Sequence, residues 1–390
     1  MFNIPVSKPV SSNPTIIADE RIPYVREAFQ SLGTLIPMPG REMNAITIRD
    51  ADILLVRSIT RVDEALIGKS RVRYVATAST GFDHIDTDFL NDRDIHFFTA
   101  AGCNANSVSE YIAAAIAELC NRFKLRFNDL TLGVIGAGKI GTRAADKARA
   151  IGMNVLYNDP PLKDETGDDA YLPLDTILAR SDIVTLHVPL TYGGHYPTAN
   201  MVNEDFLAEM KPASFIINTS RGAVVNEDAL LDRLSGRHLR GAVLDVWRDE
   251  PAINTELLKR TEIGTPHIAG HSVDGQVNAT IMVYNDLCSF LKREPDWKPE
   301  GLPVPDQPVL SLDGCKSMQE EITKALLHAY PVLYDDQNLR QIIDADNEVR
   351  PALFDKVRNE RYIRREFDSY RITGCDDTTL NVLTKLGFKT

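Results

Sequence analysis

The run TLGVIGAGKIGTRAADKARAIGMNVLYND, from Thr131 to Asp159, constrains the fold more than any other stretch of the chain. An apolar strand leads into three glycines, a helical pattern follows, and a second short strand ends the run. In such a unit, Gly136, Gly138 and Gly141 permit a tight turn, close approach of backbone N–H groups to a pyrophosphate, and close packing of helix on strand. The run therefore predicts a dinucleotide bound at the amino end of a helix.

An acidic residue closes this run and bears on the choice of cofactor. Asp159 follows Gly138 by about 20 residues, where a carboxylate can accept hydrogen bonds from a ribose 2′-hydroxyl and repels a 2′-phosphate. The sequence therefore favours NAD over NADP. We assign Lys139 and Ile140, inside the glycine run, to cofactor binding as well. The competing interpretation is a structural glycine turn in which Asp159 only caps a helix.

Composition limits the class of protein. The 390 residues suit two or three domains, and 43% hydrophobic with 25% charged residues is ordinary for a globular chain. A net charge of −12 argues against nucleic acid or an anionic membrane surface as the main partner. The five cysteines have no metal-ligand spacing, and we find neither a signal peptide nor an apolar run of membrane-spanning length. We expect a cytoplasmic protein without a metal.

Strand-like and helical stretches alternate along most of the chain, which predicts parallel sheets and an α/β fold. We expect two Rossmann-like, doubly wound domains. The substrate-binding domain is discontinuous, at 13–108 and 268–295, and the NAD-binding domain spans 109–267. An alanine-rich helix, apolar nearly all round, marks the crossover into the second domain.

The end of the chain has a different pattern. A proline-rich linker begins near residue 295 and leads into a small α+β domain, so that the third domain spans 296–390. We expect helices at its beginning and end, with a charged region between them. This domain shows no catalytic motif, and we expect it to mediate association, either with a second copy of the chain or with the first domain.

Polar residues follow two predicted strands of the first domain. Arg57 and Ser58 end the stretch ADILLVRS, and Ser79 begins the loop 79–81. Because ligands gather at the carboxyl ends of parallel strands, we expect these residues to lie on one binding edge. Surface loops with ordinary turn chemistry are the alternative.

Three residues after strands of the second domain could carry out chemistry. Arg221 in NTSRG can hold a carboxylate through a bidentate pair, and His267 in TPHIAG can accept the proton of a hydroxyl as hydride leaves the same carbon. Glu250 in DVWRDEP would orient the imidazole and favour its protonated form. Taken singly, each could be a salt-bridged arginine, a turn acid or a structural histidine. Because they follow a predicted dinucleotide-binding motif in the same domain, the three together predict a catalytic set.

Other residues near these strand ends have open roles. His187 would line the nicotinamide side or pack there, and His271, four residues after His267, could touch substrate. Asp245 could accept a hydrogen bond from the nicotinamide carboxamide, or it could be a buried structural carboxylate.

The motifs GAGKIG, HVPLT, NTSRGAVVNEDAL, LDVWRDEP and TPHIAG resemble those of the D-2-hydroxyacid dehydrogenases, and the resemblance extends over about residues 14–290. It implies NAD-dependent chemistry on a D-2-hydroxy acid with His267 as the acid/base. It implies substrate contacts at Ser58, at Ser79 (in place of a threonine) and at His271 (in place of a tyrosine). The further cofactor contacts that it implies are Asp159, Val188, Thr219, Ser220, Arg221, Asp245 and Gly270.

The resemblance thus implies an NAD-dependent dehydrogenase that oxidises a small phosphorylated 2-hydroxy acid and works as a homodimer. Arg57 is the candidate residue for binding the substrate phosphate. Alternatively, Arg57 is a salt-bridged surface residue. One rival function is a related dehydrogenase acting on phosphoglycerate or on a small unphosphorylated acid. The other is a non-catalytic NAD(H)-sensing module of the same fold.

Overall fold

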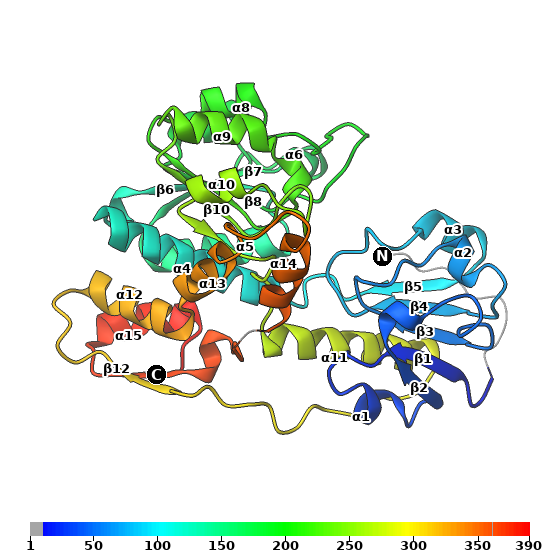
Figure 1. Ribbon diagram of the computed structural model, residues 1–390. Helices are drawn as coiled ribbons and strands as arrows, with labels where there is room; N and C mark the ends of the chain where they lie inside the picture. The colour runs from blue at the N-terminus through cyan, green and yellow to red at the C-terminus, as the bar shows by residue number, and fades with distance from the viewer. Residues whose placement is uncertain (1–10, 361) are drawn as a thin grey trace. The chain divides into compact units, whose positions relative to one another are not determined.

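The computed structural model describes residues 11–360 and 362–390 (Figure 1). The chain divides into two compact units. The first comprises the described residues up to Asn104 together with Ser272–Pro303, and the second comprises Ala105–His271 together with Val304–Thr390. The chain therefore leaves the first unit once and returns to it for one long helix.

The first unit is a parallel five-stranded sheet with helices packed on it, in the order β2-β1-β3-β4-β5. Apolar side chains of α11 share a core with β1, β3 and α1, which explains why the chain returns here. The strands are β1 (Thr15–Asp19), β2 (Thr34–Met38), β3 (Ile53–Val56), β4 (Tyr74–Thr77) and β5 (His96–Thr99). The helices are α1 (Val25–Phe29), the short η1 (Gly40–Glu42), α2 (Glu64–Ile67), α3 (Thr87–Asp92) and α11 (Val273–Phe290).

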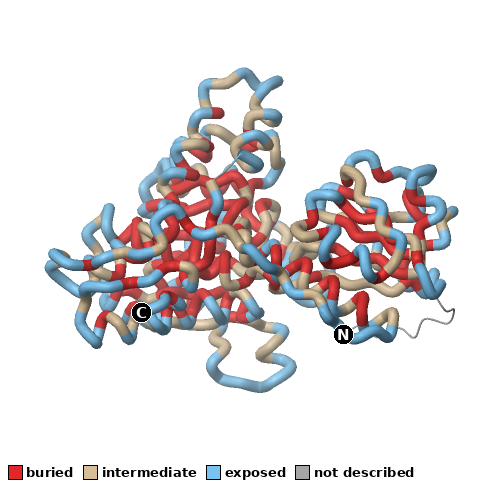
Figure 2. The backbone as a smooth tube through the Cα atoms, turned by 90° about the horizontal axis from the view of Figure 1, so that it is seen from below, coloured by how far each residue is buried: buried red, intermediate tan, exposed pale blue. Residues whose placement is uncertain are grey.

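The second unit contains a parallel six-stranded sheet in the order β11-β10-β9-β8-β6-β7. Its strands are apolar and buried along nearly their whole length (Figure 2), except the edge strand β7, which is mostly half-buried. Such burial is expected for a parallel sheet covered by helices on both faces. The strands are β6 (Thr131–Ile135), β7 (Asn154–Asn158), β8 (Ile183–Leu186), β9 (Phe215–Asn218), β10 (Gly241–Leu244) and β11 (Ile263–Gly264).

Helices connect these strands, and several begin at the capping residues that the sequence offers. Asn203, Asn226 and Asn254 each accept a hydrogen bond from a backbone N–H in the first turn of a helix. The helices are α4 (Ala105–Phe123), η2 (Phe127–Asp129), α5 (Lys139–Ala150), α6 (Pro160–Thr166), α7 (Leu174–Arg180), α8 (Glu204–Glu209), η3 (Gly222–Val224), α9 (Glu227–Ser235) and α10 (Thr255–Arg260).

The C-terminal segment, residues 304–390, belongs to the second unit and packs on α4 and α5. Its apolar side chains form one continuous core with those two helices. The sequence predicted a contact with a second copy of the chain or with the first domain, and this packing on α4 and α5 was not predicted. Its elements are the parallel strands β12 (Val309–Ser311) and β13 (Arg371–Thr373) and the helices α12 (Met318–Ala329), α13 (Val332–Arg340), α14 (Arg350–Asn359), η4 (Phe367–Ser369) and α15 (Asp377–Leu386).

The prediction of two parallel-sheet α/β domains followed by a small α+β segment is confirmed. Several elements were missed: the short β2, α2, α3, α10 and β12, and three longer helices. Helices α13 and α14 occupy the charged region of the C-terminal segment, and α6 occupies a stretch that looked like a polar turn. Helix α6 has no buried residue, so no apolar periodicity marks it; Asp159 as N-cap and proline in its first turn start it instead.

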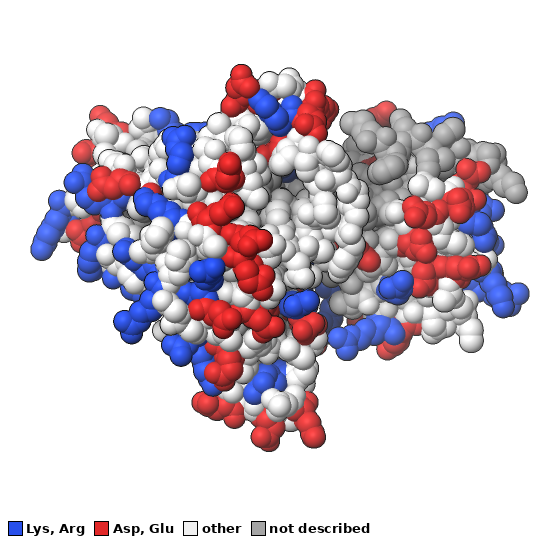
Figure 3. Space-filling model, turned by 90° about the horizontal axis from the view of Figure 1, so that it is seen from above, with Lys and Arg blue, Asp and Glu red and all other residues white. Residues whose placement is uncertain are grey.

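Two surface findings complete the fold. In the part of the chain that the structure describes, no helix combines the length and the apolar character needed to cross a membrane. The face drawn in Figure 3 carries both acidic and basic side chains.

Candidate active site

The predicted cofactor and catalytic residues of the second unit follow the carboxyl ends of its strands. Gly136 follows β6, Val188 follows β8, Arg221 follows β9, Asp245 follows β10 and His267 follows β11. Strand β6 has β7 on one side and β8 on the other, so the direction in which the chain adds strands reverses there. Ligands of open α/β sheets bind at such a switch point.

The glycine loop between β6 and α5 has the shape that a pyrophosphate requires. Gly136 has φ of 92°, and a Cβ there would lie 2.6 Å from the carbonyl oxygen of His187. At Gly141 a side chain would collide with the carbonyl of Gly136, so helix and strand pack closely. At Gly138, the N-cap of α5, nothing lies within 4 Å of the Cβ position. This open space adjoins the positive end of a helix, next to Lys139 and Ile140.

Asp159 contacts two backbone groups in this region. Its Oδ2 accepts from the N–H of Ala137 in the glycine loop at 2.8 Å, and its Oδ1 accepts from the N–H of Leu162 at 3.1 Å as the N-cap of α6. A carboxylate has about four acceptor positions, so these two bonds leave capacity for a ribose hydroxyl. The helix-cap role and the cofactor role are therefore compatible.

Further polar groups on this edge fit a bound dinucleotide. The hydroxyl oxygen of Thr219, directly after β9, is buried and has no hydrogen-bond partner among the described residues. Ser220 is satisfied locally, because its hydroxyl donates to Asn218 Oδ1 at 2.8 Å. These features and the glycine loop match the shape and donor pattern of an NAD site.

His267 and Glu250 are in direct contact. Nδ1 of His267 lies 2.7 Å from Oε2 of Glu250, and the side chains are 34% and 18% exposed. Oε1 of Glu250 accepts from the N–H of Trp247 at 2.9 Å. Burial acts to raise the pKa of Glu250, but the hydrogen bond and charge of His267 and the N–H of Trp247 outweigh it and lower this pKa. The carboxylate form is therefore the one that faces the imidazole.

Asp245 holds the loop that carries His267. It is buried, and its carboxylate accepts from the hydroxyl of Thr265 and the N–H of Ile268, both at 2.7 Å, and from the N–H of Ala269 at 2.9 Å. Burial raises its pKa, although the charge of His267 and these hydrogen bonds act to lower it. The structure thus gives Asp245 a structural role whether or not it also touches a cofactor.

Arg221 lies after the strand next to β10, so the three predicted catalytic residues follow the neighbouring strands β9, β10 and β11. Its Nη1 donates to the carbonyl oxygen of Ser220 at 2.8 Å, and its own carbonyl accepts from Asn218 at 3.0 Å. The fold therefore brings the three to one sheet edge, with Glu250 and His267 paired. Their catalytic roles stay predictions.

His187 has the features of a neutral packing residue. Its Nε2 lies 3.0 Å from the hydroxyl of Thr185, and its Nδ1 is buried without a hydrogen-bond partner among the described residues. Burial lowers the pKa of His187 to about 3. This ring is uncharged at neutral pH, as suits a wall of the nicotinamide side.

The predicted substrate residues of the first unit follow adjacent strands. Ser58 and Arg57 follow β3, and Ser79 follows β4. Arg57 Nε donates to buried Asp19 at 3.1 Å, which fits the salt-bridge alternative, while its Nη atoms make no hydrogen bond to a described residue. The hydroxyl of Ser79 donates to the carbonyl of Gly81 at 2.9 Å. His271 and Gly270 belong instead to the second unit, just after His267.

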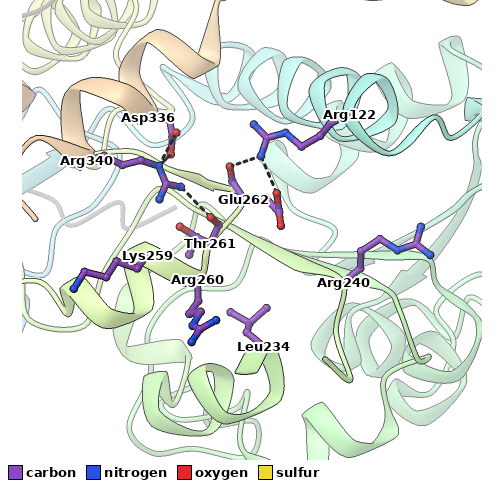
Figure 4. Close-up of a pocket in the computed structure, with 9 residues that line it drawn as sticks. All are labelled: Arg122, Leu234, Arg240, Lys259, Arg260, Thr261, Glu262, Asp336 and Arg340. Carbon is purple, nitrogen blue, oxygen red and sulfur yellow. Dashed lines mark hydrogen bonds and ion pairs between the residues drawn. The ribbon is translucent and has the colours of Figure 1, made fainter. Parts of the chain in front are cut away.

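A hollow of about 470 Å³ lies elsewhere in the second unit (Figure 4). Among its lining residues, Arg240 precedes β10, and Thr261 and Glu262 precede β11, so it adjoins the amino ends of these strands, opposite to the edge described above. Within the described ranges, no group of His, Cys, Asp or Glu side chains could hold a metal ion.

Two residues that support the His267–Glu250 pair, Trp247 and Tyr111, were not predicted from the sequence. Trp247 donates its backbone N–H to Glu250 and its indole N–H to the carbonyl of Thr265 at 3.0 Å. It therefore contacts both of the loops that carry the pair. Thr265 in turn binds Asp245 and the hydroxyl of Tyr111. Trp247 stands in the quoted motif LDVWRDEP, which was the available signal; Tyr111 carried none.

Comparison with known families agrees with this fold. Residues 110–269 match the family described as D-isomer specific 2-hydroxyacid dehydrogenase, NAD binding domain. Residues 302–387 match a domain of unknown function (DUF3410).

Among solved structures, D-lactate dehydrogenase from Aquifex aeolicus, complexed with NAD and lactic acid, is 28% identical with a TM-score of 0.59 and covers 71% of this chain and 95% of its own. The NAD-bound 3-phosphoglycerate dehydrogenase of Entamoeba histolytica is 24% identical, with a TM-score of 0.61, over 72% of this chain and 96% of its own; it supports the fold alone.

Curated relatives match almost the whole chain. Erythronate-4-phosphate dehydrogenase of Proteus mirabilis is 37% identical over 96% of this chain and 98% of its own length, and that of Bacteroides fragilis is 37% identical over 92% and 98%. Because the likeness includes the C-terminal segment as well as the NAD-binding domain, this chain belongs to the erythronate-4-phosphate dehydrogenase family of D-isomer-specific, NAD-dependent 2-hydroxyacid dehydrogenases.

Proposed function

We propose that this chain oxidises 4-phospho-D-erythronate at C2 with NAD⁺ and yields (R)-3-hydroxy-2-oxo-4-phosphooxybutanoate, NADH and a proton. The product would serve pyridoxine 5′-phosphate (vitamin B6) biosynthesis. The observation that carries the proposal is the His267–Glu250 pair at 2.7 Å, on the carboxyl edge of an NAD-binding sheet. The substrate follows from the name of relatives that match the chain nearly from end to end.

The chemistry assigns one task to each catalytic residue. Glu250 occupies Nδ1 of His267, so Nε2 is the atom left to take the proton of the C2 hydroxyl. A bound NAD⁺ supplies the acceptor for the C2 hydride. Arg221 would hold the substrate carboxylate, because a planar guanidinium fixes both its charge and its plane.

The first unit would bind the rest of the substrate. Ser58, Ser79 and the backbone of the 79–81 loop are the proposed contacts, with Ser79 and this loop near the carboxylate. Arg57 is the proposed partner of the phosphate, because Asp19 uses only its Nε and the other side of the guanidinium has no hydrogen bond to a described residue. His271, beyond the His267 loop, is a further proposed contact.

The assembly and the domain roles belong to the same proposal. Residues 13–108 with 268–295 would bind substrate, 109–267 would bind NAD, and 296–390 would form the dimer contact of a cytoplasmic homodimer. The C-terminal segment exposes six large apolar side chains, which supports association: Val304, Val309, Met318, Tyr334, Val349 and Ile363. Sedimentation equilibrium should give twice the chain mass of 43.4 kDa.

The substrate proposal is tested by initial rates of NADH formation with 4-phospho-D-erythronate, 3-phosphoglycerate and D-lactate in parallel. We expect kcat/KM to be highest for phosphoerythronate by at least about tenfold, a discrimination of about 1.4 kcal/mol. A higher kcat/KM with 3-phosphoglycerate or D-lactate would identify that acid as the substrate instead. Tight NADH binding without turnover of any of the three would favour the sensor instead.

A further inference from the structure

A fully buried arginine connects the C-terminal segment to the His267 loop. Arg364 lies between α14 and η4, and its side chain is 1% exposed. Its Nη1 donates to the carbonyl oxygen of Ala269 at 2.8 Å, and its Nη2 donates to that of Ser107 at 2.6 Å. Both acceptors belong to the Ala105–His271 part of the second unit.

The setting of this guanidinium is specific to arginine. The Cζ atom of Arg364 lies 3.9 Å from the ring centroid of Tyr330, and its Nη2 lies 4.0 Å from Oε2 of Glu110. A buried cation is costly unless its donors and its charge are satisfied. The planar fork meets part of this need by reaching two carbonyls at once, whereas its Nε is buried without a hydrogen-bond partner among the described residues. The single ammonium of a lysine cannot reproduce this fork.

The His267 loop is therefore held from two sides. Asp245 binds the N–H groups of Ile268 and Ala269, and Arg364 binds the carbonyl of Ala269. His267 itself has φ of 59°, a left-handed conformation that a non-glycine residue keeps only when its surroundings fix it. Arg364 is one of the residues that fix this conformation, through its hydrogen bond to Ala269.

The same contact sets the direction of a backbone donor. In a trans peptide, the C=O and the N–H point in opposite directions, so the amide that accepts from Arg364 through Ala269 directs the N–H of Gly270 away from it. This N–H makes no hydrogen bond to the residues that the structure describes. Gly270 is among the predicted cofactor contacts, so this donor is available to a ligand.

We propose that Arg364 is a positioning residue for hydride transfer, and that the C-terminal segment serves the active site of its own chain through it. The arginine fixes the 265–270 loop, and with it the imidazole of His267 and the amide of Gly270. The inference rests on the proposed function for the roles of His267 and Gly270. It gives the domain of unknown function a task within the chain, separate from any dimer contact.

The test compares Arg364→Lys with a matched control, Arg340→Lys. Arg340 also lies in the C-terminal segment and also donates to two carbonyls of the NAD-binding domain, those of Leu258 and Thr261, each at 2.9 Å. Figure 4 shows the bond to Thr261. Its partners precede β11, whereas Ala269 follows the strand and His267. Both variants keep the charge and lose the fork, so both should lower the melting temperature.

Only Arg364→Lys should affect hydride transfer. We expect its kcat/KM to fall about 10- to 100-fold below that of Arg340→Lys, because small displacements of reacting groups cost rate steeply. The primary isotope effect with C2-deuterated phosphoerythronate should rise in this variant. NADH should bind more weakly, by fluorescence titration, and amide hydrogen exchange in residues 265–270 should quicken.

Equal rates and isotope effects in the two variants, at matched loss of melting temperature, would overturn the inference. If the wild-type protein turns over none of the three acids, the proposed function fails, and NADH affinity with hydrogen exchange still decides the role of Arg364. If Arg364→Lys does not fold, Tyr330→Leu removes the ring under the guanidinium and keeps the arginine. The same criteria apply to it, with a smaller effect expected.

Discussion

At the scale of single residues, the site depends on one imidazole held in an uncommon backbone conformation. His267 has a positive φ, its N–H donates to the carbonyl of Asp245 at 2.7 Å, and its Nδ1 contacts Glu250. Backbone and side chain are therefore both fixed before a substrate arrives. If His267 is the proposed acid/base, such preorganisation would favour proton transfer, because no free energy would be spent on orienting the imidazole during the reaction.

Removing this proposed base should separate chemistry from cofactor binding. Asparagine tolerates the left-handed conformation of residue 267, so His267→Asn removes the imidazole with little backbone strain. We expect kcat to fall by a factor on the order of 10² to 10⁴ with NAD affinity nearly unchanged. His187→Gln is the control and should leave the pH profile of kcat/KM as it is, because the pKa of His187 is lowered to about 3. An equal loss of NAD binding in His267→Asn would identify His267 as structural.

A buried carboxyl in α4 should make stability depend on pH. Burial raises the pKa of Glu110 to about 8, although the charges of Lys147 and Arg364 act to lower it. Between pH 4.5 and about 8 the folded state then binds more protons than the unfolded state, so the free energy of unfolding falls as pH rises through this window.

Glu110→Gln should remove that decline. The amide resembles the protonated carboxyl, so wild type and variant should be similar near pH 5, and the variant should be the more stable by on the order of a few kcal/mol above pH 8. Burial lowers the pKa of Lys147, and the charge of Glu110 acts to raise it, so the variant changes the titration of this lysine as well. Urea unfolding at three pH values measures the effect. Parallel pH curves would contradict it.

At the scale of elements, Asp159 connects the glycine loop after β6 with the start of α6. Asp159 directly follows β7 and is the N-cap of α6, and its carboxylate also accepts a hydrogen bond from the N–H of Ala137 in the glycine loop. The sequence offered a ribose contact and a helix cap as competing interpretations. The structure shows that one carboxylate has the geometry for the cap and retains acceptors for the ribose.

Asp159→Ser should therefore change cofactor preference without a large loss of stability. Serine is a good N-cap, so the cost to α6 should be a few tenths of a kcal/mol, whereas the negative charge that repels a 2′-phosphate is lost. We expect NAD affinity to fall about tenfold and the preference for NAD over NADP to shrink. Asp159→Ala, which also removes the cap, is the comparison. An unchanged ratio of NAD to NADP affinity would mean that Asp159 acts as a cap alone.

At the scale of the whole molecule, the C-terminal segment cannot be separated from the NAD-binding domain. Its helices α12 and α15 cover α4 and α5, and their side chains form one core. Helix α4 is buried almost all along its length for this reason. A segment that looks like an appended domain in the sequence is, in packing, part of the second unit.

Ending the chain after Pro303 should accordingly destabilise the NAD-binding domain itself. The truncation uncovers the apolar faces of α4 and α5, which then favour aggregation. We expect a melting temperature more than about 10 °C lower, or insoluble protein, together with binding of a hydrophobic dye. A truncated chain that is monomeric, keeps the wild-type melting temperature and binds NADH would show that the segment serves association only.

The sequence by itself determined the local units of this protein. Strand, glycine turn and helix could be predicted around Gly136, and the strand-end residues Arg221, Glu250 and His267 could be selected, because turn chemistry, apolar periodicity and parallel-sheet topology act over short stretches. Only the tertiary structure decided what holds these residues in place. The contact of Arg364 with Ala269 spans 95 residues, and it exists because two buried helix faces pack together, which no local pattern records.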